Sequence, residues 1–181
     1  MQRDDLLVWI DLEMTSLEDV QVDQIIEIAT ILTDQDLNIV AEGPSLVVHT
    51  PRSAFSRITE KVLGIHTRSG IIEDAEKSEV SEKEAEEKTL AFLKEYATPQ
   101  SAPVCGNSIW VDRHFLRVRM PSIHEYLDYH CIDVSTLKQL AKRWAPSTYA
   151  KLKKAERHRA KDDILESIEE LKYWRKEIFR I

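Results

Sequence analysis

The spacing of apolar residues divides the chain into a strand-rich first part and a part that alternates strands with helices. Three early runs, at residues 6–15, 24–33 and 37–49, are rich in aliphatic, β-branched and aromatic side chains and are separated by polar breaks. Runs of this kind are typical of β-strands, and the first is apolar enough to be buried on both faces. We therefore expect three consecutive strands in a meander that ends at Pro51.

The rest of the chain predicts helices and two short strands. Residues 54–72 have the composition of short helices and loops around Gly64 and Gly70, and Ser81 with Glu84 forms a capping box at the start of an amphipathic helix. The expected elements are then a helix over 81–97, a strand over 103–106, a helix that ends near 121, a strand over 131–133, a helix over 134–144 and a last helix over about 160–178. This order predicts one α/β domain, spanning residues 1–181, with a mixed five-stranded sheet flanked by helices.

Length and composition narrow the class of protein. With 181 residues, of which 43% are hydrophobic, the chain is long enough to bury its own core. No apolar run approaches the ~18 residues of a membrane span, and the first strand begins at Leu6, which leaves no room for a targeting segment. Cys105 and Cys131 lie singly in apolar stretches, so we expect both to be reduced core residues. These features predict a cytoplasmic protein, or one of the mitochondrial matrix if the chain is a processed form, with no membrane partner.

The net charge of −7 is unevenly distributed along the chain. Residues 73–87 hold eight acidic residues against two lysines, a local charge of −6, which leaves the rest almost neutral. Residues 151–161 instead gather six basic residues and one acidic residue around His158. This segment either binds a phosphate-rich ligand or is a solvated loop. The weak total charge favours a small substrate over long nucleic acid.

Asp11 and Glu13 lie near the end of the first predicted strand. Residues two apart in a strand point to the same side, so both carboxylates leave the strand together. Two carboxylates this close repel each other unless a cation lies between them, and hard oxygen ligands suit Mg²⁺ or Mn²⁺. The alternative is a pair of solvated charges at a strand end.

Two further aspartates follow the short strands. Asp112 lies on the carboxyl side of the fourth strand, where open α/β sheets place ligands, although a helix N-cap is the simpler role. Asp133 has the same two roles open to it, and there capping is favoured.

The periodicity of the last helix separates Asp162 from Asp163. Ile164, Ile168, Leu171 and Ile178 lie on one face of this helix. Asp163 lies at the edge of that buried stripe, about 100° from its centre, whereas Asp162 lies about 160° away and faces water. Asp163 is therefore the better inward ligand. His158, five residues earlier, becomes a candidate general base, although a lone loop histidine is more often a surface residue.

With these residues in place, the chain resembles the oligoribonucleases of the DEDDh 3′→5′ exonuclease superfamily. That superfamily carries an Asp-Glu-Asp-Asp set with a histidine five residues before the last Asp, a pattern that fits Asp11, Glu13, Asp112, His158 and Asp163. The matching stretches are residues 9–15, 24–34, 37–44, 106–109, 132–136 and 158–163. They occur in order over nearly the whole chain, so their joint match is specific although each is weak alone.

The resemblance implies a ribonuclease-H-like α/β fold, a homodimer and 3′→5′ hydrolysis of very short RNA, especially dinucleotides, to nucleoside 5′-monophosphates. It implies that Asp11, Glu13, Asp112 and Asp163 bind two Mg²⁺ or Mn²⁺ ions and that His158 is the general base. Carried over by position, the implied substrate contacts are Leu17 as a wedge between two bases, His66, the hydroxyls of Ser108, Ser135 and Thr136 at the 5′ phosphate, and Tyr129 from the partner subunit.

Some positions depart from the family's pattern. Ser16 replaces a glycine, Lys61 a tryptophan and His130 an arginine, and one extra residue lies between Leu17 and Asp23. Losing the arginine removes a bidentate phosphate donor, so part of the substrate pocket differs while the catalytic set is intact. The same two-metal chemistry on longer RNA or on DNA 3′ ends is the main alternative. A non-catalytic nucleotide binder or a structural protein would explain the acidic set and histidine less well.

Overall fold

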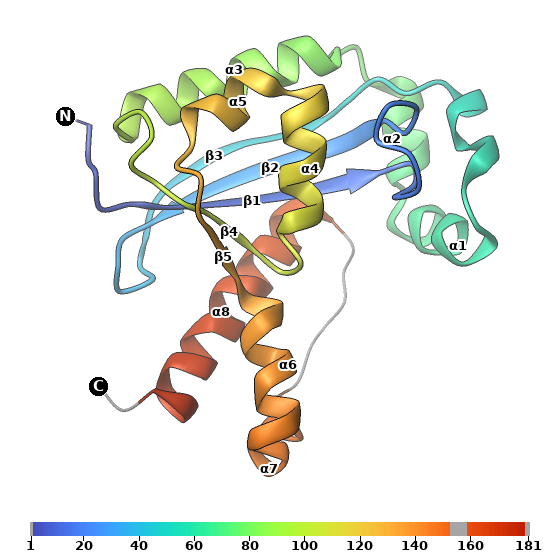
Figure 1. Ribbon diagram of the computed structural model, residues 1–181. Helices are drawn as coiled ribbons and strands as arrows, with labels where there is room; N and C mark the ends of the chain where they lie inside the picture. Colours follow the sequence, from blue (N-terminus) through green and yellow to red (C-terminus); the bar gives the residue numbers. More distant parts are fainter. Residues whose placement is uncertain (1, 153–158, 180–181) are drawn as a thin grey trace.

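The structure is a computed structural model and describes residues 2–152 and 159–179. Its centre is a five-stranded sheet with the strand order β3-β2-β1-β4-β5 (Figure 1). The strands are β1 (Leu7–Met14), β2 (Ile25–Thr33), β3 (Ile39–Val47), β4 (Val104–Gly106) and β5 (Cys131–Asp133). Strands β1 to β3 form the predicted antiparallel meander, and β4 and β5 run parallel to β1. The predicted mixed five-stranded sheet is confirmed.

Helices cover both faces of the sheet and one of its ends (Figure 1). One face carries α3 (Glu82–Tyr96), α4 (Trp110–Arg119) and α5 (Pro121–Tyr126), and the other carries α6 (Val134–Trp144) and α8 (Ala160–Ile178). The short helix α7 (Pro146–Tyr149) follows α6, while η1 (Arg52–Arg57), α1 (Glu60–Ser69) and α2 (Ile71–Lys77) lie between β3 and α3 in the sequence. In the part of the chain that the structure describes, no helix is both long and apolar enough to span a bilayer.

The central strand β1 sends alternate side chains into two hydrophobic clusters. Val8 and Ile10 pack in the cluster that includes Phe115 of α4, whereas Trp9 packs with Ile164 of α8. Because side chains alternate along a strand, Asp11 and Glu13 follow Trp9 onto the face that α8 covers. The sequence of β1 thus directs two carboxylates toward the last helix.

Most predicted elements are confirmed, with boundaries that differ by at most two residues and agree at both ends for β5, α6 and α8. Ser81 caps α3 as predicted, since its side chain accepts a hydrogen bond from the Glu84 amide at 3.2 Å. The prediction that both cysteines are core residues is wrong for Cys131. Cys105 is buried in a central strand, but Cys131 is exposed because it belongs to β5, an edge strand with a neighbour on one side only.

Candidate active site

Three carboxylates from the two ends of the sequence meet on one face of the sheet. Asp11 and Glu13 of β1 and Asp163 in the first turn of α8 each offer an oxygen, and these oxygens all lie within 4.8 Å of one another. Asp162, the neighbouring residue, does not belong to this cluster. The helical periodicity therefore selected the aspartate that faces the β1 carboxylates.

Asp112 reaches the same region from the other side of the sheet. It is buried in the first turn of α4, and its Oδ1 accepts a hydrogen bond of 2.9 Å from the Leu12 amide. The N-cap role considered for it is wrong, because the N-cap of α4 is Ile109. The physical reason is the short length of β4. Its pairing with β1 ends at Trp9, so the Leu12 amide finds its acceptor in the Asp112 carboxylate instead of in a strand.

Asp133 has the capping role that the sequence favoured. Its side chain accepts a hydrogen bond of 2.9 Å from the Ser135 amide at the start of α6 and another of 3.0 Å from the Ser108 amide.

The carboxylates are strongly perturbed by burial and by one another. Burial, followed by the charges of Asp112, Glu13, Asp163 and Glu27, raises the pKa of Asp11 well above its usual range. For Glu13, burial and the charges of Asp163, Glu27 and Asp112 raise the pKa to about 8, although the guanidinium of Arg159 opposes this shift. Burial raises the pKa of Asp112 to about 7 against the stabilising hydrogen bond from Leu12. Carboxylates that lie this close together and have raised pKa values are stabilised in their charged form by a divalent cation, and their oxygen atoms are the ligands that Mg²⁺ and Mn²⁺ prefer.

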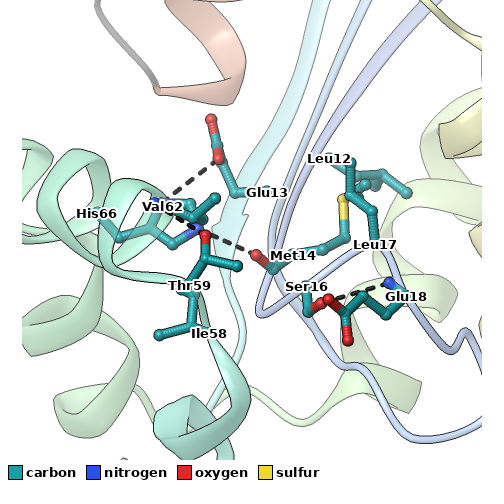
Figure 2. A pocket seen from close by; sticks show the side chains of 10 residues that line it. All are labelled: Leu12, Glu13, Met14, Ser16, Leu17, Glu18, Ile58, Thr59, Val62 and His66. Atoms are coloured by element: carbon teal, nitrogen blue, oxygen red, sulfur yellow. Dashed lines mark hydrogen bonds and ion pairs between the residues drawn. The ribbon is translucent and has the colours of Figure 1, made fainter.

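A cavity of about 340 Å³ opens beside Glu13 (Figure 2). Leu17 and His66 both line it and lie on opposite sides in the view, with Met14 between them. Leu17 is 65% exposed, whereas His66 is buried, with Nε2 3.0 Å from the Met14 carbonyl oxygen and Nδ1 3.7 Å from Glu13 Oε2. The structure therefore brings both predicted contacts into one cavity with Glu13 of the carboxylate cluster. Ser16, one of the departures from the family's pattern, also lines this cavity.

The three predicted hydroxyl residues share a second hollow of about 710 Å³. Ser108 and Ser135 lie side by side there, because the Ser108 amide donates to Ser135 Oγ at 3.0 Å and the two hydroxyl oxygens are 3.3 Å apart. The backbone of Ser108 has a φ of 53°, a left-handed conformation that residues with a side chain rarely adopt. The hydrogen bonds from its amide to Asp133 and Ser135 hold it in this conformation. The lining is completed by Trp110, Asp133, Thr136, Lys138, Gln139, Leu140 and Arg143.

One predicted substrate contact is not brought into these cavities. Tyr129 is 77% exposed, stacks on His130 with ring centroids 3.8 Å apart, and lines neither hollow. His158 lies outside the described residues, as does the side chain of Lys61.

One buried charge and two ion pairs were not predicted from the sequence. Glu27 of β2 is a buried acid in a strand whose nine residues are all buried, and an acid within an apolar run was the signal available. Arg159 and Lys161 of the basic segment pair with Glu27 and Glu42.

The chain is similar to known exonucleases. The exonuclease family model RNase_T matches residues 8–171, and the chain belongs to this exonuclease family. Two solved structures show the same fold. Exonuclease I of Methylocaldum szegediense has a TM-score of 0.67 at 18% identity over 96% of this chain, and a zinc-bound complex of E. coli ExoI with single-stranded DNA has 0.69 at 14% over 98%. The chain spans about 41% of each of those longer chains. The expected ribonuclease-H-like fold is confirmed.

Relatives with higher sequence identity show which group of exonucleases the chain belongs to. Oligoribonuclease of Haemophilus ducreyi is 49% identical over 175 residues, which cover 97% of this chain and 95% of the relative. Oligoribonuclease of Vibrio cholerae is 48% identical over 178 residues, which cover 98% of each. Within the exonuclease family, the chain belongs to the oligoribonucleases.

Proposed function

We propose that the chain is a 3′→5′ exoribonuclease that hydrolyses very short RNA, especially dinucleotides, to nucleoside 5′-monophosphates. The observation that carries this proposal is the cluster of Asp11, Glu13 and Asp163, whose oxygens lie within 4.8 Å of one another beside the Leu17 cavity. The full-length similarity to oligoribonucleases supports the choice of substrate. In this proposal one catalytic domain spans residues 1–181.

Asp11, Glu13, Asp112 and Asp163 would hold two Mg²⁺ or Mn²⁺ ions. Bound divalent cations would lower the pKa of water and offset charge on the phosphate and the departing oxygen. The protein's own task is to keep four carboxylates within reach of such ions. Asp112 does so through its bond to the Leu12 amide, and Asp163 through its place in the first turn of α8.

The chemical step is an in-line displacement at phosphorus. A water oxygen forms a bond to the phosphorus atom, the bond from phosphorus to the 3′ oxygen breaks, and the released 3′ oxygen takes up a proton. His158 would accept the proton that the attacking water loses.

The two hollows would select substrate by length. Leu17 would separate the two bases, with His66 beside it, while the hydroxyls of Ser108, Ser135 and Thr136 would bind the 5′ phosphate of a substrate two nucleotides long. Hydroxyl groups donate hydrogen bonds to phosphate oxygens, and Lys138 and Arg143 in the same hollow add positive charge.

We infer a cytoplasmic homodimer in which Tyr129 reaches the partner's site. Its support is the exposure of three large aromatic side chains, Trp110 (67%), Tyr129 (77%) and Trp144 (76%), because exposed aromatics are enriched at interfaces. A stable, active monomer in light scattering would remove Tyr129 from the substrate contacts.

Product analysis tests the function. A 5′-phosphorylated RNA dinucleotide and a seven-nucleotide RNA, each in ribose and deoxyribose form, are incubated with the protein and Mn²⁺ or with chelator. Metal-dependent conversion that is fastest for the RNA dinucleotide supports the proposal. Preference for the longer chain or for DNA would instead mean that Ser16, Lys61 and His130 mark a different substrate, and absence of any product would refute hydrolysis.

A further inference from the structure

Glu27 is a buried acid to which the proposed chemistry gives no role. Its side chain is 3% exposed, and it is paired in register with Glu13 across β1 and β2. The negative charge of Glu27 raises the pKa of Asp11 and of Glu13, so it disfavours the ionisation of these neighbouring carboxylates. A buried carboxylate in this place requires compensating partners.

The partners come from the start of α8. Glu27 faces Arg159 in a forked arrangement, with Nε donating to the two carboxylate oxygens at 3.3 and 3.2 Å and Nη2 donating to Oε1 at 3.1 Å. Its Oε2 also accepts a hydrogen bond of 3.1 Å from the Ala160 amide, the first amide of the helix. The N-cap of α8 is Arg159, which makes no side-chain cap of its own, so a strand residue far away in the sequence caps this helix.

The same turn leads directly to Asp163. The Asp163 amide donates to the Arg159 carbonyl oxygen at 3.0 Å, which is the first helical bond after the cap. Arg159 also donates through Nη1 to Asp74 of α2 at 3.0 Å, so three elements meet at one guanidinium. The position of Arg159 therefore sets where Asp163 stands relative to Asp11 and Glu13.

We propose that Glu27 and Arg159 are positioning residues that form a clamp on the first turn of α8 and hold Asp163 in the carboxylate cluster. This inference rests on the proposed function for its catalytic consequence, but the clamp itself predicts a property of metal binding. Groups that orient metal ligands typically change metal affinity or activity by about 10- to 100-fold when they are removed.

The chain supplies a matched control on the same turn. Lys161 of α8 pairs with Glu42 of β3 at 2.7 Å, again a strand glutamate with a helix cation, but both side chains are about half exposed. Exposed pairs of this kind contribute little to structure. Glu27→Gln and Glu42→Gln therefore make the same chemical change to two ion pairs of one helical turn, and only the first touches the clamp.

The experiment compares these variants by Mn²⁺ titration calorimetry, steady-state kinetics on the RNA dinucleotide and thermal unfolding. For Glu27→Gln we expect Mn²⁺ affinity to fall about 10-fold and kcat about 10- to 100-fold, with KM within about threefold. Glu42→Gln should keep all three within about twofold. Arg159→Lys retains the charge but not the fork, so it should show an intermediate loss, and it carries the test if Glu27→Gln does not fold.

Two results would overturn the clamp: a folded Glu27→Gln protein with wild-type Mn²⁺ affinity and kcat, or equal losses in Glu42→Gln. The proposed function can fail separately. If the wild-type protein forms no product but Glu27→Gln still loses Mn²⁺ affinity, the clamp stands and the exoribonuclease proposal falls.

Discussion

Asp112 shows how a single residue can serve the proposed function at a cost in stability. It is buried with a pKa of about 7, and its hydrogen-bond donor is a neutral backbone amide. At pH 8 the metal-free protein therefore holds a charge that burial disfavours. A carboxylate kept under these conditions is expected at a site that needs it ionised for a ligand.

Asp112→Asn should separate stability from activity. The amide oxygen of Asn can accept the Leu12 hydrogen bond without the buried charge, so in chelator at pH 8 we expect Tm to be unchanged or raised by about 2–4 °C. Mn²⁺-dependent hydrolysis should fall by about 10²-fold or more because a metal ligand is lost. Calorimetric unfolding and product formation measure the two effects, and a variant that keeps wild-type activity would remove Asp112 from the ligands.

His158→Ala tests the general base. Turnover should fall by about 10²- to 10⁴-fold, the usual contribution of such a group, while Mn²⁺ affinity stays near that of the wild type because the carboxylates are untouched. Rates from single-turnover reactions and a Mn²⁺ titration provide the comparison. An unchanged rate would exclude His158 as the base.

At the scale of elements, regular periodicity was enough to predict the parts that carry the site. The alternation in β1 and the helical stripe of α8 placed Asp11, Glu13 and Asp163 correctly, because each pattern repeats over several residues and fixes a direction. The short elements η1, α5 and α7 have no such repeat. Pro51 and Pro121, at the starts of η1 and α5, predict only where the preceding strand and helix end.

The spacing of residues along the chain does not predict contacts between elements that are distant in the sequence. Asp112 binds the Leu12 amide across 100 residues, and Glu27 meets Arg159 across 132. Neither separation leaves a trace in spacing along the chain. The N-cap role considered for Asp112 failed because the length of β4, and not the helix, decides where its side chain goes.

The junction of β4 and α4 should be intolerant of added volume. A Cβ on Gly106 would lie 3.0 Å from Ile109 Cδ1 and 3.2 Å from the Ile10 carbonyl oxygen, so Gly106→Ala should push α4 away from β1. We expect a loss of about 1–3 kcal/mol in the free energy of unfolding and a fall in activity as Asp112 shifts. Denaturant unfolding and kinetics measure both.

Gly64→Ala is the control for that change. Gly64 lies within α1, and its Cβ would meet only Arg68 Nη1 at 3.5 Å, which is ordinary contact. Alanine in a helix interior should stabilise the protein by up to about 1 kcal/mol. A stabilised Gly106→Ala protein would contradict the tight junction.

At the scale of the whole molecule, the acidic site makes stability depend on pH. Unfolded Asp and Glu titrate near pH 4, whereas Asp112 and Glu13 titrate at about 7 and 8 in the metal-free fold. The folded protein therefore holds these protons more tightly than the unfolded chain. The resulting stabilisation is complete below about pH 4 and is lost as the pH rises through 7 to 8.

We therefore expect the Tm of the chelated protein to decrease between pH 5.5 and 8.5, and Mn²⁺ to raise Tm more at the higher pH, where cation and proton no longer compete. Thermal unfolding across this range, with and without Mn²⁺, tests the sign. A double variant Asp112→Asn with Glu13→Gln should flatten the curve. A chelated wild-type protein that becomes more stable over the same interval would contradict the shifts.

The carboxylates of Asp11 and Asp163 lie 152 residues apart along the chain, yet they belong to one cluster. During synthesis at about 5–20 residues per second, roughly 8–30 s separate the appearance of the first from that of the second. Until α8 has emerged and docked, the growing polypeptide has only part of its site. Each newly made copy therefore acquires its complete carboxylate cluster only after residue 163 has been synthesised.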